Sequence, residues 1–119
     1  MSLDSTLKDA AIELTKADIS RFRQYLIILQ ERHVPADAKY DAAMFVKKMS
    51  AALARLKKET AEQQFTIFYN YYFNGQRREV IAESVKVDAS TITRNSKRTL
   101  RKLANIVYFD LMNADLIYP

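Results

Sequence analysis

Two strong helix breakers lie inside this chain, Pro35 and Gly75, and they constrain its fold more than any other feature. Pro35 cannot continue helical hydrogen bonding, so residues 32–35 should end a helix. Asn74 and Gly75 mark a second helix stop. Because a chain of 119 residues with one glycine and two prolines has few tight turns, we predict an all-α fold.

Hydrophobic spacing predicts four helices before Gly75. They cover residues 3–15, about 18–31, about 37–58 and about 61–73. Thr15 or Asp18 is the expected cap of the second helix. In that helix Tyr25 and Ile27 widen the apolar face beyond what one neighbour would cover. The helix therefore either lies centrally in the fold or contributes to a dimer interface.

Two side-chain groups in this part of the chain have both a structural and a functional interpretation. The fourth helix has aromatic residues on one face: Phe65, Phe68, Tyr69 and Tyr72. Such a cluster can stack on bases, but at helical spacing we interpret it as core. The third helix has a basic outer side: Lys47, Lys48, Arg55, Lys57 and Lys58. We interpret that side as solvated.

After Gly75 the pattern is typical of a helix-turn-helix. Residues 78–85 form its first helix, in which Ile81 and Val85 lie one turn apart on the buried side. Ala82 lies where a second helix must cross closely, because a larger side chain would push the two helices apart.

The turn covers residues 86–88. Val87 should fill the angle between the two helices, and the carboxylate of Asp88 should cap the second helix by accepting from its free amides. The second helix, residues 89–103, has an apolar face made of Ile92, Ser96, Leu100 and Leu103, which continues to Val107. Beyond residue 103 the helix should continue through Phe109, and this apolar end is covered either by the first helices or by a second subunit.

Positive charge is concentrated on this helix pair. Residues 77–102 hold eight Lys or Arg against three acids, a balance of +5 that equals the net charge of the whole chain. A local basic excess of this kind is the expected electrostatic footprint of phosphate binding. We therefore predict that the pair binds double-stranded DNA, with helix 89–103 in the major groove.

The spacing of polar residues divides the predicted contacts into two groups. Contacts to base edges are assigned to the start of the second helix: Ser90, Thr91, Thr93, Arg94 and Lys97. Arg94 is the best candidate for a bidentate contact to guanine. Contacts to backbone phosphates are assigned to Arg77, Arg78, Arg98, Arg101 and Lys102.

Three segments of residues 62–108 also carry a family resemblance: EQQFTIFYNYYFNG, REVIAESVKVDASTITR and KRTLRKLANIVY. Together they resemble region 4 of sigma factors, and within that group the ArpU and RinA type of phage late-gene transcriptional regulators. Lys86 stands where many such motifs have a turn glycine, and Asn95 stands where a second apolar residue is common. The resemblance implies a phage or prophage activator of a late promoter that contacts RNA polymerase.

These observations divide the chain into an N-terminal helical region for support or oligomerisation, residues 1–59, and a DNA-binding region, residues 60–119. We expect a homodimer, because a monomer with so few contacts would bind DNA weakly. The alternative is a module that binds RNA polymerase or another regulator and has little DNA affinity. The small residues Ala89, Ser90 and Thr91 at the start of the second helix favour that alternative.

Other functional classes lack sequence support. The chain has no cysteine, a single histidine, His33, and no glycine-rich phosphate loop, so we expect no enzyme, no metal and no cofactor. It has no run of about eighteen apolar residues, and its first residues lack the order of a signal peptide. We therefore expect a cytoplasmic protein with no membrane partner.

Overall fold

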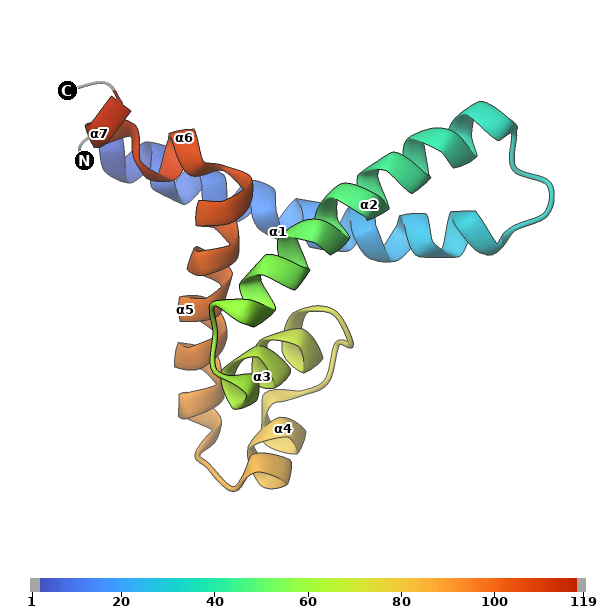
Figure 1. Cartoon of the computed structure of the whole chain (residues 1–119). Coiled ribbons are helices and arrows are strands. Elements are labelled where there is room, and N and C mark those ends of the chain that lie inside the picture. Colours follow the sequence, from blue (N-terminus) through green and yellow to red (C-terminus); the bar gives the residue numbers. More distant parts are fainter. Residues whose placement is uncertain (1–2, 118–119) are drawn as a thin grey trace.

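The structure, a computed structural model, describes residues 3–117, and within that range it contains seven helices and no strand. In chain order they are α1 (Leu3–Gln30), α2 (Ala36–Lys58), α3 (Glu62–Tyr72), α4 (Arg78–Val85), α5 (Ala89–Val107), α6 (Phe109–Met112) and α7 (Ala114–Ile117) (Figure 1). The predicted all-α fold class is confirmed. Figure 1 shows α1 and α2 as a hairpin whose tip, the end of α1 and the start of α2, projects away from α3, α4 and α5.

The connection in the hairpin falls where Pro35 predicts it. α1 ends at Gln30, and α2 begins directly after Pro35. The two helices are held together partly by the rings of Tyr25 and Phe45, whose centroids are 5.3 Å apart in an edge-to-face arrangement.

α1 is one continuous helix, so the predicted division near Thr15 and Asp18 is wrong. The Thr15 hydroxyl donates to the carbonyl of Ala11 at 2.7 Å, one turn earlier in the same helix. Asp18 is buried, and its carboxylate accepts a hydrogen bond from the Tyr108 hydroxyl. Both residues lie inside α1, so neither side chain caps a helix end. Each makes its hydrogen bond without interrupting the backbone hydrogen bonds of the helix.

The main core is shared by four helices from both halves of the chain. Its buried residues are Ile19 and Phe22 of α1, Met49, Leu53 and Leu56 of α2, Phe68 of α3 with the following Phe73, and Leu100 and Leu103 of α5. Phe68 is fully buried, and Phe65, Tyr69 and Tyr72 pack against this core. The interpretation of the aromatic cluster as core is therefore confirmed, and the core crosses the boundary between residues 1–59 and 60–119.

A second, smaller core holds α4 against α3 and α5. It consists of Ile67, Ile81, Ala82 and Ile92. Ala82 is only 6% exposed, and α4 packs directly on α5, so the small side chain stands at a close helix contact as expected.

The end of α5 folds back onto α1. α5 ends at Val107, and Tyr108 leaves helical geometry with φ −122° and ψ 51°, so the predicted continuation through Phe109 is wrong. α6 and α7 then pack along α1 (Figure 1), so the first helix covers part of this apolar end, while Val107 and Phe109 stay 36% and 52% exposed. The hydrogen bond from Tyr108 to Asp18 lies at this junction.

Candidate nucleic-acid interface

α4 and α5 are joined by a short turn, residues 86–88, that requires an unusual backbone conformation. Lys86 has φ 61° and ψ 49°, in the left-handed region. The backbone N–H groups of Lys86 and Val87 both donate to the carbonyl of Ala82, the second at 3.0 Å. These bonds end α4 in the manner of a glycine-terminated helix, although a side chain in this region is strained.

The structure bears on two predictions about this turn. Val87, expected to fill the angle between the helices, is 37% exposed and is not among the residues of the small core. Asp88 does occupy the N-cap position of α5, but its carboxylate makes no capping hydrogen bond. Instead, its backbone carbonyl accepts from the N–H of Thr91 at 3.0 Å and of Ile92 at 3.4 Å.

α5 has two clearly separated faces. The buried face consists of Ile92, Ser96, Thr99, Leu100, Leu103 and Ala104. Arg94, Lys97, Arg98, Arg101 and Lys102 are all exposed, at the three- and four-residue spacing that places them on the opposite side of the helix. The predicted division of α5 into a packing face and a basic face is therefore what the structure has.

The residues predicted to contact bases differ in how they are held. Arg94 is exposed, and its Nη2 donates to the hydroxyl of Thr91 at 3.3 Å. Thr93 is half-buried, and its hydroxyl accepts from Arg78 Nη1 at 3.4 Å. Ser90 and Lys97 are exposed. The Arg78 contact brings the start of α4 against the second turn of α5, a pairing that the sequence did not indicate.

Arg78 also has a carboxylate partner. Its Nε donates to Glu79 Oε1 at 3.2 Å, and both side chains are largely exposed. A hydrogen bond from the Glu79 backbone N–H, followed by the one from Arg78, lowers the pKa of this carboxyl below its usual value. Arg78 is thus partly neutralised before any ligand approaches.

The other predicted cations differ from Arg78 in this respect. Among the ion pairs of residues 3–117, none involves Arg77, Arg94, Lys97, Arg98, Arg101 or Lys102. All six are exposed, and they lie on α5 or directly before α4. The five on α5 form a row of positive charge along its exposed side, which suits a polyanion.

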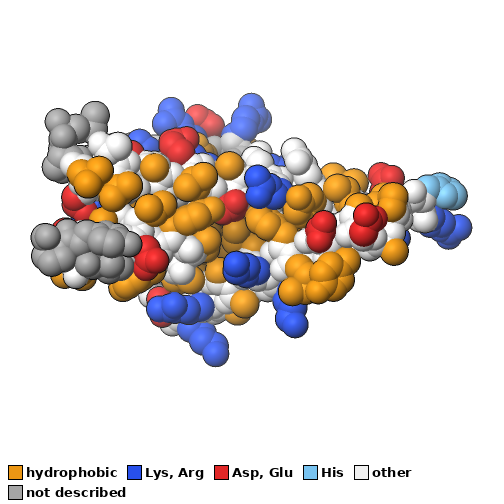
Figure 2. Space-filling view, turned by 90° about the horizontal axis from the view of Figure 1, so that it is seen from above, with side chains coloured by type: hydrophobic (Ala, Val, Ile, Leu, Met, Phe, Trp, Pro, Cys, Tyr) orange, Lys and Arg blue, Asp and Glu red, His pale blue; other side chains and the backbone are white. Residues whose placement is uncertain are grey.

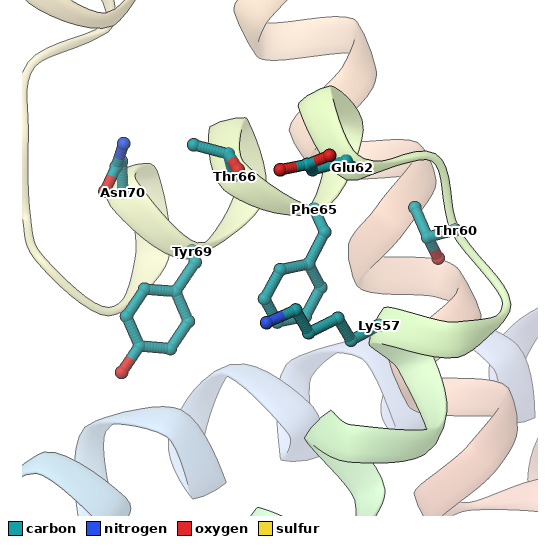
Figure 3. Close-up of a pocket in the computed structure, with 7 residues that line it drawn as sticks. All are labelled: Lys57, Thr60, Glu62, Phe65, Thr66, Tyr69 and Asn70. Atoms are coloured by element: carbon teal, nitrogen blue, oxygen red, sulfur yellow. The ribbon is translucent and has the colours of Figure 1, made fainter.

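A separate cavity of about 360 Å³ lies between the end of α2 and α3 (Figure 3). None of the ten residues predicted to contact DNA lines it. The rings of Phe65 and Tyr69 are stacked with centroids 6.0 Å apart, and Lys57 Nζ lies 6.0 Å from the centroid of Phe65. The stacked rings could be predicted from the sequence, because Phe65 and Tyr69 are one helical turn apart in α3. Nothing in the sequence indicates that Lys57 reaches them, since that depends on how α2 faces α3.

Two further properties bear on partners. None of the helices within residues 3–117 is both long and apolar enough to span a bilayer. Comparison of the chain with protein-family models, with curated proteins and with solved structures found no match. The case for a function therefore rests on the residues and the geometry described above.

Proposed function

We propose that this protein is a sequence-specific regulator of transcription that binds double-stranded DNA. The observation that carries the proposal is a set of six exposed cations without ion pairs among the described residues. Five lie on α5 opposite its packing face, and Arg77 lies directly before α4. Region 4 of sigma factors, which residues 62–108 resemble, supports treating the pair as a helix-turn-helix. In that arrangement the start of α5 enters the major groove.

Within this proposal, the two groups of residues have different tasks. Ser90, Thr91, Thr93, Arg94 and Lys97 contact base edges, and Arg94 is the residue we assign to guanine. Arg77, Arg78, Arg98, Arg101 and Lys102 contact phosphates, which positions α5 without reading sequence. The hydrogen bond between Arg78 and Thr93 supports a fixed angle between the two groups.

The resemblance to the ArpU and RinA type supports a more specific role. We propose activation of late genes in a phage or prophage, with a contact to RNA polymerase. We also propose a homodimer on paired half-sites, since one α5 offers few base contacts. Light scattering on the purified chain tests the dimer, and a monomer at micromolar concentration would count against paired half-sites.

The main test is selection from a pool of random duplex DNA at two salt concentrations, followed by sequencing of the bound fraction. We expect one enriched motif, ideally a two-fold repeat, and an affinity that falls steeply with salt. Arg94→Ala should weaken the selected site by about 1–3 kcal/mol and relax its sequence at one position. Arg98→Ala should weaken all sequences and reduce the salt slope by about 1. Arg32→Ala, which removes an exposed arginine from the hairpin connection, is the matched control and should change neither.

A protein-interaction module is the second candidate, and the structure contains an observation in its favour. Val80 of α4 and Val87 of the turn are 47% and 37% exposed, so the helix pair presents apolar as well as basic side chains. On this reading the random pool yields no motif, and Arg94→Ala with Arg98→Ala leaves function largely intact. The same variants therefore separate the two candidates.

A further inference from the structure

A second cavity, larger than the one beside Lys57, lies away from the α4–α5 turn, where the hairpin meets the end of α5. It has a volume of about 520 Å³ and is lined by residues of α1, α2, α5 and Tyr108. This volume falls within the range of ligand and peptide pockets. We refer to it as the hairpin cleft.

The walls of the hairpin cleft are mainly apolar. They are formed by Phe45, Met49, Ala51 and Ala52 of α2 and by Ile106 and Val107 of α5. Ala51 and Val107 are exposed, so the cleft opens to solvent instead of being closed by its own side chains. In the view of Figure 2, hydrophobic side chains gather over the middle of the molecule, with Lys and Arg side chains placed singly around them.

The charges of the cleft are predominantly positive. Arg21, Lys48 and Arg55 line it, against one acid, Asp18. Asp18 is only 7% exposed and is already engaged by the Tyr108 hydroxyl. An incoming positive group would therefore find little free acceptor here.

The three cations differ in how firmly they are held. Arg55 Nε donates to Glu59 Oε1 at 3.0 Å. The Arg21 guanidinium lies 5.5 Å from the centroid of the Phe45 ring and forms no ion pair within residues 3–117. Lys48 is exposed and has no carboxylate within ion-pair distance in the same range. Lys48 and Arg21 are thus available to carboxylates of a ligand.

We propose that the hairpin cleft binds an acidic amphipathic helix of a partner protein. Apolar side chains on one face of that helix would enter between Phe45, Ala51 and Val107, as in other helix-in-groove complexes. Its carboxylates would meet Lys48 and Arg21 at the rim, which gives the complex its charge complementarity. The apolar walls favour a peptide over nucleic acid, since a phosphate backbone has nothing to place against aliphatic side chains.

This site is independent of the proposed DNA interface. None of the ten residues assigned to DNA lines the cleft. A variant such as Arg94→Ala should leave peptide binding unchanged, so failure of one proposal would not imply failure of the other.

The test is a panel of fluorescent synthetic peptides with leucine or phenylalanine anchors one or two helical turns apart. Each is made in a form with glutamate on the remaining face and a form with lysine there, and each is titrated with the full chain while anisotropy is measured. We expect glutamate peptides to bind at least about ten-fold more tightly than their lysine counterparts.

Matched variants then locate the binding. Lys48→Glu should weaken binding of the glutamate peptides about ten-fold or more. Lys47→Glu, the same charge change on the preceding residue of α2 and outside the cleft, should have little effect. Ala51→Trp should block the cleft, whereas Ala54→Trp, at an exposed position of α2 that does not line it, should not.

Four results would overturn the proposal, the last of them displacement by DNA. The first is no binding by any glutamate peptide, and the second is equal binding by the two charge forms. The third is an equal effect of Lys47→Glu and Lys48→Glu, which would show general electrostatic attraction. Displacement of a bound glutamate peptide by unlabelled duplex DNA from a site sensitive to Lys48→Glu would assign the cleft to nucleic acid instead.

Discussion

The two halves of α5 are held in very different ways. Its second half, with Leu100 and Leu103, belongs to the main core built by α1, α2, α3 and α5. Its first half contributes Ile92 to a cluster of four buried residues with α3 and α4. The residues assigned to base contacts all lie on the weakly packed half.

The difference shows that one half of α5 anchors the helix in the main core, while the other half carries the exposed candidate interface. The main core fixes the direction of α5, whereas α4 is held mainly by the small core that it shares with α3 and α5. Between the two clusters lies Ser96, which is fully buried and whose hydroxyl has no hydrogen-bond partner among the described residues. We expect damage to the main core to unfold the chain, and damage to the small core to loosen α4 first.

Leu103→Ala should have the largest effect. Leu103 is completely buried in the main core, and truncation leaves a cavity that several helices would have to close. The free energy of unfolding should fall toward the upper end of the roughly 2–5 kcal/mol range for such changes. Urea denaturation measures this, with Leu116→Ala, 74% exposed in α7, as the control. A similar small loss in both variants would mean that the main core does not carry stability as described.

Ile92→Ala should cost less and act locally. Ile92 is also completely buried, but its cluster is small, so we expect a loss nearer the lower end of roughly 2–5 kcal/mol. Hydrogen exchange should speed up in α4 while α1 remains protected. Val80→Ala at an exposed site on α4 is the control. Equal loss of protection in α1 and α4 would break the distinction between the two cores.

Tyr108→Phe tests the junction between α5 and α1. It leaves the buried Asp18 carboxylate without the Tyr108 hydroxyl, and a hydrogen bond to a charged group contributes about 1.5–3 kcal/mol. Tyr40→Phe at a 64% exposed tyrosine should change stability little. Denaturant midpoints of the two variants provide the comparison, and identical midpoints would contradict a stabilising junction.

The same tyrosine predicts a pH dependence. Desolvation, and then the hydrogen bond with Asp18, raise the pKa of Tyr108 from 10.0 to about 12. Because the folded value is the higher one, its contribution is fully present below about pH 10 and is lost as the pH rises toward about 12. Between about pH 10 and 12 the free energy of unfolding should fall as the pH rises, and this fall should be smaller in Tyr108→Phe.

Lys86→Gly should have the smallest effect, and it should stabilise. Glycine adopts the left-handed conformation of residue 86 without the steric cost of a side chain. Because the substitution also removes a charge, the proper reference is Lys86→Ala, which removes the charge and keeps the strain. Glycine should exceed alanine by about 1 kcal/mol in thermal or urea unfolding. Equal stability would mean that the turn relaxes in solution.

Local sequence signals predicted the parts of the fold that depend on local chemistry. Pro35 predicted the connection between α1 and α2. The spacing of Ile81, Ile92 and Leu103 predicted the buried faces of α4 and α5. Asp18 was misread as a cap because its partner, Tyr108, lies 90 residues away in sequence. The exposure of Val87 depends on the angle between α4 and α5, which spacing within either helix does not encode.

The candidate sites show the same limit. The basic face of α5 follows from one helix, so the sequence was sufficient to predict it. The hairpin cleft combines Arg21, Lys48 and Val107 from three helices, and Lys48 was interpreted only as part of a solvated side. A site assembled from several elements becomes visible once their packing is known.

α5 runs without a break from Ala89 to Val107, and at about 1.5 Å per residue it is roughly 28 Å long. It joins the end that we propose reads DNA to the main core without a linker. In a homodimer, two such rods would hold their reading ends at one separation and one rotational phase. Adding about five base pairs between the half-sites would turn the second half-site to the opposite side of the duplex. The unbroken helix would thus make the regulator selective for operator spacing as well as for operator sequence.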